Sequence, residues 1–274
     1  MKDFKHKLFL FKKIKNISVC SVFFIIFIYI GIQPFVESLA FVRYAVYLLV
    51  IIGIAFVFFY ESKFSAAERF IEETQLQIDD AGYYLTSRDE SGIEDFSKAL
   101  IEDLNSCGFK IDENSDSNGL SFDFTAVKGI EYIYCVKLEK GDRNDVIAYC
   151  EEAKNDLLSN KFKRKGECVV FFICDDADES AVALSKSFTR VFVSRYNVII
   201  ISPVIIEPGS KKVYFLGNRI SRTQKLVSEF AMNCELPIKD KYICFEKLKF
   251  QKELEEKMKD FNLADFKSGK FYER

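Results

Sequence analysis

Asp123 and Lys137 stand on neighbouring apparent strands, in the stretches SFDFTAV and YIYCVKL. A carboxylate on one strand, with a second carboxylate two residues before a lysine on the next, can hold a metal ion that polarises a phosphate and activates water. Here the position two before Lys137 is Cys135. Magnesium prefers oxygen ligands, and a neutral thiol is a poor one. We therefore expect a catalytically degenerate site, and the alternative is that Lys137 is a solvent-facing strand residue.

The residue counts exclude several other kinds of active site. The only histidine is His6, in the N-terminal basic segment, so Ser-His-Asp, Cys-His and His-ligated zinc sites are effectively excluded. None of the eight cysteines forms a Cys-x-x-Cys pair, which argues against zinc and, with no disulfide framework, favours a reducing compartment. Neither a Gly-x-Gly-x-x-Gly motif nor a Walker A loop is present. We expect no cofactor and no metal.

The charge balance argues against nonspecific binding to nucleic acid. The chain has 39 Lys+Arg and 41 Asp+Glu, of which residues 1–63 hold eight and three. Residues 64–274 therefore carry 31 basic and 38 acidic residues, a net charge of −7. A phosphate backbone is bound nonspecifically through a basic surface, which this composition does not offer.

Residues 93–217 are expected to form the α/β domain that carries Asp123 and Lys137. Their pattern predicts a helix, a polar turn, a hairpin, a second helix, a buried strand, a third helix and a second buried strand, which is typical of a three-layer core. The predicted ranges are 93–107, 112–119, 120–127 with 130–138, 143–158, 168–174, 178–196 and 198–206. Pro203 is expected near the edge or end of the last strand. The acidic residues at 175–179 are interpreted as a helix N-terminal cap.

The order of these elements resembles the fold of restriction-endonuclease-like proteins, especially the Mrr-type group. The resemblance rests on the leading helix, the Gly108-Phe109 step, Asp123 and the run Cys135-Val136-Lys137. It implies a metal-binding role for Asp123, a catalytic role for Lys137 and a possible match of the family's helix glutamate to Glu94. Because Cys135 replaces the acidic or glutamine residue of the family, we expect a domain used for binding or assembly rather than an enzyme.

Two long apolar runs predict a transmembrane hairpin, residues 17–60. The first span runs from Ile17 to Val36 without a charge, and the second runs from Leu39 to Tyr60 with Arg43 near its start. Each is long enough for a hydrocarbon core of ~30 Å. Residues 1–16 contain six lysines, so the positive-inside rule places both termini in the cytoplasm of a multi-pass inner-membrane protein. A cleaved signal peptide ending at residues 38–40 is the weaker alternative.

A helix over residues 64–86 is expected to follow the hairpin, within a juxtamembrane segment and linker of residues 61–92. Its apolar positions recur at steps of three and four: Phe64, Ala67, Ile71, Thr74, Ile78, Ala81 and Leu85. This seam could oligomerise the chain as a coiled coil, or pack the helix on its own domain. The C-terminal segment, residues 218–274, is expected to be helical over 221–234 and 243–259.

The layout of hairpin and cytoplasmic domain resembles that of two-transmembrane effectors of bacterial antiviral systems, including those of retrons. That resemblance implies a domain that senses or binds a cytoplasmic protein or nucleoprotein partner, and a hairpin that then perturbs the inner membrane, with the lipid bilayer as its other partner. The chain could form homo-oligomers. The alternatives are a membrane-anchored nuclease and a passive anchor that recruits a soluble partner.

The expected topology can be tested with reporter fusions. Fusions after residue 64 and after residue 274 should both report a cytoplasmic location, because the lysines precede the first span. A periplasmic signal from either fusion would contradict the hairpin topology and favour the signal peptide.

Overall fold

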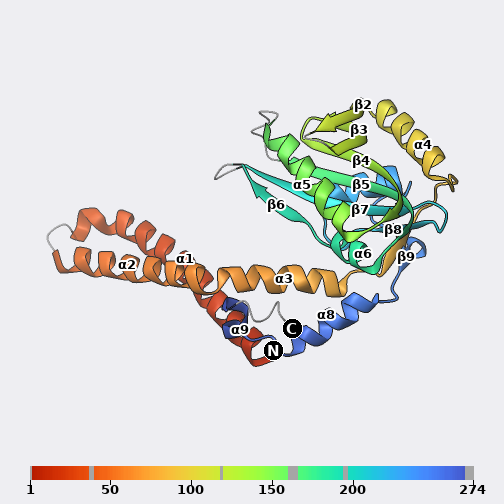
Figure 1. Ribbon diagram of the computed structural model, residues 1–274. Helices are drawn as coiled ribbons and strands as arrows, with labels where there is room; N and C mark the ends of the chain where they lie inside the picture. Colours follow the sequence, from red (N-terminus) through yellow and green to blue (C-terminus); the bar gives the residue numbers. More distant parts are fainter. Residues whose placement is uncertain (1, 37–39, 118–119, 160–165, 194–196, 269–274) are drawn as a thin grey trace. The chain divides into compact units, whose positions relative to one another are not determined.

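The computed structural model describes residues 2–36, 40–117, 120–159, 166–193 and 197–268 (Figure 1). The chain forms two compact units. One consists of Met1–Thr74 with Leu254–Arg274, and the other of Gln75–Glu253. The second unit is thus inserted in the sequence of the first.

The first unit contains two helices that are long and apolar enough to cross a membrane. Helix α1 spans Lys2–Val36 and helix α2 spans Ala40–Lys63, with candidate spans at Leu8–Gln33 and Phe41–Lys63. The two apolar runs are therefore helical, as predicted, although α1 also takes in the basic N-terminal segment. Of the residues expected to bound the spans, Leu39 lies outside the described residues.

The two apolar helices pack closely at a glycine. A methyl group added to Gly53 of α2 would meet Cγ2 of Val22 on α1 at 2.5 Å, so the two helices approach here more closely than a larger residue permits. The rings of Tyr29 and Tyr47 also meet, edge to face, with centroids 6.4 Å apart. Gly31 of α1 has nothing within 4 Å of the same added atom.

Helix α3, Ser65–Asp79, follows α2 almost without a break. The backbone N–H of Phe64 bonds to the carbonyl of Tyr60 at 2.8 Å, and that of Glu68 bonds to the carbonyl of Phe64 at 2.9 Å. In the first unit, Phe70 of α3 packs its ring on Phe261 and Phe266, with centroids 6.0 and 5.0 Å away. The C-terminal residues of the chain thus contribute to the same unit as the hairpin.

The second unit is a mixed α/β domain with a nine-stranded sheet (Figure 1). The strand order is β2-β3-β4-β5-β7-β8-β1-β9, and β6 pairs with β7 off this path. The β4–β5 and β5–β7 pairs are parallel, and the other pairs are antiparallel. The strands are β1 Tyr83–Leu85, β2 Lys110–Ser117, β3 Leu120–Lys128, β4 Glu131–Gly141, β5 Gly166–Ala177, β6 Thr189–Phe192, β7 Val198–Glu207, β8 Lys212–Tyr214 and β9 Ile243–Cys244.

Alternate residues of the central strands point to opposite faces of the sheet. They pack in two different hydrophobic cores, and helices cover both. Cys135 packs in one core with Phe96 and Leu100 of α4, while Tyr134 packs in the other with Val146 of α5. The helices that follow α3 in the chain are α4 Ile93–Ser106, α5 Arg143–Ser159, α6 Glu179–Ser185, α7 Arg222–Leu226, the π-helix Val227–Ala231, the 3₁₀-helix Asp240–Tyr242, α8 Lys249–Lys259 and α9 Leu263–Lys267, of which α9 lies in the first unit.

Several predicted elements are shorter or of another type than the sequence indicated. The expected helix over 64–86 ends at Asp79, and residues 83–85 form β1 instead. The expected helix over 178–196 ends at Ser185 and is followed by β6, and that over 243–259 begins only at Lys249, after β9. In each case a short segment gains backbone hydrogen bonds from another strand, which is distant in sequence for β1 and β9 and is the next strand, β7, for β6. Local helical periodicity cannot indicate such pairing.

Residues 112–117, predicted as a polar turn, belong to strand β2. Asp112 pairs with Thr125 and Ser117 with Leu120 across an antiparallel ladder. The strand lies at the edge of the sheet, where polar side chains reach solvent while the backbone bonds to β3.

Pro203 lies inside β7, and it is tolerated because one side of the strand is open there. It pairs with Val170 of β5. On the other side, β6 ends its pairing at Ile201 and β8 begins at Ile205, so no described strand requires a donor from residue 203. Pro203 was expected near the edge or end of the strand, but it lies in the middle of an interior strand, at a gap between β6 and β8.

A buried ion pair joins the residue after α3 to the residue after α6. Nζ of Lys186 lies 2.8 Å from Oδ2 of Asp80, and both side chains are fully buried. Lys186 also donates to the carbonyl of Ala81 at 2.9 Å. Asp80 accepts further hydrogen bonds from the Tyr84 hydroxyl at 2.7 Å and the Asn218 N–H at 2.9 Å. A desolvated pair of this kind needs such additional bonds to be tolerated.

Replacing Asp80 by Asn should lower the free energy of unfolding by about 3–5 kcal/mol, because Lys186 is left buried without its counter-ion. Denaturant unfolding of the full chain in detergent, followed by circular dichroism, measures the change. Asp79→Asn is the matched control. Asp79 is exposed and bonds to Gln75, so its effect should stay within about 0.5 kcal/mol.

The double variant Asp80→Asn with Lys186→Met should recover much of the loss, because no unpaired charge remains buried. Equal unfolding midpoints for Asp80→Asn and Asp79→Asn would show that the pair does not stabilise the domain.

Candidate active site

Asp123 lies where strands β3 and β4 part. Their pairing begins at Lys128 and Glu131 and ends at Phe124 and Cys135. Beyond that point the Asp123 side chain, rather than the β3 backbone, bonds to β4. Its Oδ2 accepts the backbone N–H of Lys137 at 2.7 Å.

The local irregularity of β3 is also visible in its packing. Phe122 and Phe124 would share one face of a regular strand, yet they pack in different cores. The strand is therefore distorted at Asp123, and the carboxylate is turned towards β4.

The side chain of Lys137 joins two carboxylates from different elements. Its Nζ lies 2.9 and 3.0 Å from the two carboxylate oxygens of Glu94, in the first turn of α4. It also lies 3.2 Å from Oδ1 of Asp123. The three residues Glu94, Asp123 and Lys137, singled out from the sequence, are thus in contact.

The contacts keep the Lys137 ammonium protonated. The hydrogen bond to Glu94 raises the pKa of Lys137 most, partial burial opposes that shift, and Asp123 adds to it. A lysine with a raised pKa is charged throughout the neutral range and is a poor general base.

Cys135 does not join this group. Its side chain is fully buried in the same core as Phe124 and Phe171, and burial raises the pKa of its thiol well above the ordinary value. Cys135 is therefore a neutral, apolar core residue.

These residues do not fit the magnesium ion that the family resemblance implied. The lysine ammonium already lies between the two carboxylates, where a cation would be held. Among the residues that the structure describes, no group of three or more His, Cys, Asp or Glu side chains is placed to hold a metal ion. The arrangement is a charge cluster of one ammonium between two carboxylates, and it ties α4 to the end of the β3–β4 pair.

Asp178 of the acidic run 175–179 caps helix α6, as predicted. Its Oδ1 accepts the N–H of Ala181 at 2.6 Å, and this hydrogen bond is the main cause of its lowered pKa. The capping role accounts for this carboxylate without a ligand.

The residues of the expected oligomerisation seam are occupied within the single chain. Ile71 and Ile78 are buried, and Phe64 stacks on Phe11 with ring centroids 5.2 Å apart. Leu85 is not on the helix but in β1, paired with Lys212. The seam is thus not an exposed stripe.

The sequence pattern did not identify the carboxylates that face the N-terminal lysines. Lys12 pairs with Glu68 and Glu72, and Lys15 pairs with Glu61. The partners lie more than forty residues apart, and only the apolar hairpin between them could have indicated that they meet.

The full chain in detergent should show no magnesium-dependent cleavage of DNA or RNA, because the oxygen ligand expected at position 135 is missing. Gel assays with single- and double-stranded substrates measure this, with Asp123→Ala and Lys137→Ala as controls for a contaminating nuclease. Cleavage by the natural chain that both substitutions abolish would show that the site is active.

No family model matches the chain, and neither a curated protein nor a solved structure matches it.

Proposed function

We propose that the chain is a membrane-anchored effector of the bacterial inner membrane. Its hairpin crosses the bilayer with both termini in the cytoplasm, and its α/β domain binds a cytoplasmic signal or partner that causes the hairpin to perturb the membrane. The setting proposed is antiviral defence, in keeping with the layout. The observation that carries the proposal is the pair of apolar helices, which approach closely at Gly53 and are followed almost at once by the helix α3.

The connection between hairpin and domain favours an effector over a passive anchor. An anchor needs only a flexible tether, for which Gly- and Ser-rich sequence suffices. Here the connection is the helix α3, which begins two residues after α2 ends. The residue after α3 is Asp80, half of the fully buried pair with Lys186. The segment that follows the hairpin is therefore a helix rather than a Gly- and Ser-rich tether.

The α/β domain is proposed to be a restriction-endonuclease-like fold that has lost catalysis. Helix α4, the antiparallel strands β2 to β4, helix α5 and the parallel strand β5 follow one another in the order that this resemblance implies. The neutral Cys135 and the internally paired Lys137 support a binding role. The net charge of −7 makes a protein or nucleoprotein partner more suitable than bare nucleic acid.

A membrane-anchored nuclease is the second candidate. The observation in its favour is the contact of Glu94, Asp123 and Lys137, which come from three elements. Cleavage that depends on these residues would support this candidate over the effector.

The effector function can be tested by following the membrane potential. Moving one charge across a potential of ~100 mV is worth about 2.3 kcal/mol, so a modest leak costs a cell energy. Expression of the full chain, with its native neighbouring genes and an infecting phage, should depolarise cells stained with a potential-sensitive dye. Gly53→Leu should remove most of the depolarisation, because the larger side chain clashes with Val22 and separates α1 from α2.

Gly31→Leu is the matched control, since an added side chain at Gly31 meets no neighbouring atom within 4 Å. It should depolarise cells as the natural chain does, at equal membrane abundance. An unchanged potential in every condition, phage infection included, would remove the effector function and leave the anchor.

A further inference from the structure

The N-terminal part of α1 presents two faces, and one of them is fixed by ion pairs within the first unit. Nζ of Lys12 lies 2.5 Å from Glu68 and 2.8 Å from Glu72. Lys15 lies 3.2 Å from Glu61. Because Lys12 and Lys15 are paired with these carboxylates, this face of α1 is directed towards α2 and α3.

Aromatic contacts hold the same face. The ring of Tyr60 is fully buried, with the Lys15 ammonium 4.5 Å from its centroid, and its hydroxyl donates to Glu68 at 2.7 Å. Phe11 stacks on Phe64. The remaining face of α1 is consequently exposed, with no freedom to turn inward.

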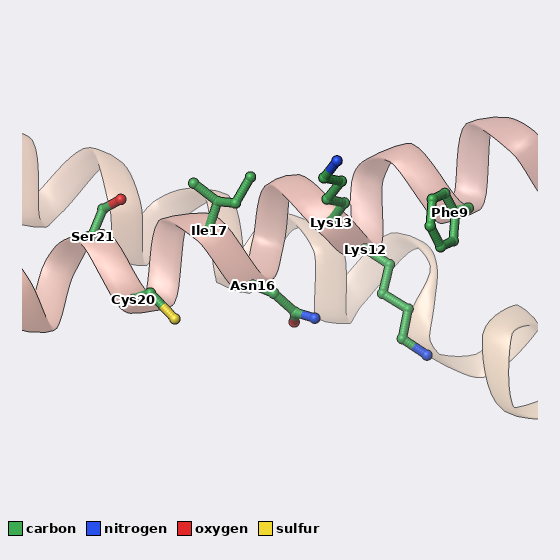
Figure 2. A pocket seen from close by; sticks show the side chains of 7 residues that line it. All are labelled: Phe9, Lys12, Lys13, Asn16, Ile17, Cys20 and Ser21. Carbon is green, nitrogen blue, oxygen red and sulfur yellow. The ribbon is translucent and has the colours of Figure 1, made fainter.

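That exposed face contains a hollow of about 530 Å³ between two rows of side chains (Figure 2). Phe9, Lys13 and Ile17 form one row, at steps of four residues. Lys12, Asn16 and Cys20 form the other. Side chains four residues apart are neighbours on a helix surface, so the rows run side by side along α1.

The lining of the hollow is mostly apolar, with Lys12, Lys13 and Asn16 among its polar groups, and it continues into the uncharged run that begins at Ile17. Lys13 is exposed, and the described part of the chain offers it no ion-pair partner. Asn16 is exposed one turn further on, followed by Ile17, which is 54% exposed, and by Cys20. The first uncharged run begins at Ile17. The last lysine before Asn16 and Ile17 is thus followed at once by the uncharged span expected from the sequence, Ile17–Val36, whose start is where a bilayer interface would lie.

We propose that this hollow binds the headgroup of an anionic phospholipid of the cytoplasmic leaflet. The ammonium of Lys13 binds the lipid phosphate, the Asn16 amide donates to a headgroup oxygen, and Ile17 and Cys20 pack on the acyl chain. A free phosphate would use only the few polar groups of the hollow, and the mostly apolar lining is what favours a lipid. Lys12 lines the hollow as well as pairing with Glu68 and Glu72, so the headgroup competes with these carboxylates for its ammonium.

The inference rests on the proposed insertion of the hairpin in a membrane, and the absence of tryptophan allows both to be tested together. The chain contains no Trp, so Phe9→Trp places a single fluorophore at the edge of the hollow. The full chain is reconstituted in phosphatidylcholine vesicles that carry a small fraction of spin-labelled phosphatidylglycerol or spin-labelled phosphatidylcholine. Quenching of the fluorescence gives the relative association of the two lipids with the site.

Labelled phosphatidylglycerol should quench more than labelled phosphatidylcholine. Lys13→Gln should lower the association of phosphatidylglycerol relative to phosphatidylcholine about fivefold, which corresponds to about 1 kcal/mol for one lysine near a membrane surface. Lys63→Gln is the matched control, because Lys63 is an exposed lysine at the end of α2 that lies over the Phe59 ring and outside the hollow. Lys63→Gln should leave the ratio of quenching by labelled phosphatidylglycerol to quenching by labelled phosphatidylcholine unchanged.

Equal quenching by the two lipids would overturn the lipid site and leave the proposed function standing. An equal loss for Lys13→Gln and Lys63→Gln would also overturn it, because general surface charge would then explain the preference. Quenching by neither lipid would show that the hairpin does not insert, and would overturn both proposals.

Discussion

The buried pair of Asp80 and Lys186 is the constraint on which the arrangement of the α/β domain depends. Each charge is tolerable only while the other is present, because neither side chain has contact with water. Asp80 follows α3 and comes shortly before β1, which pairs with both β8 and β9. The pair therefore fixes the point at which the helix from the hairpin ends and the sheet begins. It also explains why α3 does not run on through the apolar positions at Ala81 and Leu85.

Elements with a strong local pattern could be predicted from the sequence, and features that depend on the assembled fold, such as this buried pair, could not. Strands β5 and β7 and helices α4 and α5 have strong patterns of their own, and the sequence indicated them with small errors at the ends. Strands β1, β2, β6 and β9 are short or polar pieces whose type depends on pairing, with the next strand for β2 and β6 and with distant strands for β1 and β9. The lysine and aspartate of the buried pair are 106 residues apart, and neither belongs to a recognisable motif. Burial of a charge is a property of the assembled core, which local sequence does not express.

Three of the four candidate residues lie together, and the fourth, Cys135, is in the hydrophobic core instead. Glu94, Asp123 and Lys137 meet as the family resemblance implied, yet their contacts are with one another. The Asp123 carboxylate also accepts a backbone N–H of β4 at the point where the pairing with β3 stops. Where two strands part early, the backbone N–H groups left unpaired need another acceptor. Cys135 completes the hydrophobic core behind them. A reading from residue types alone cannot separate a catalytic carboxylate from one that closes the end of a sheet.

The insertion of the α/β domain within the sequence of the first unit has a consequence for the order of synthesis. Ribosomes make the hairpin and α3 first, then the whole of Gln75–Glu253, and only afterwards the residues from Leu254 onward. Phe261 and Phe266, which pack on Phe70, therefore reach their places only after the α/β domain has been translated. The hairpin can enter the membrane early, while the unit that contains it stays incomplete. A ribosome that stalls inside the α/β domain would leave two apolar helices in the bilayer without the aromatic contacts that finish their unit, so complete translation is itself a condition for this part of the molecule to be assembled.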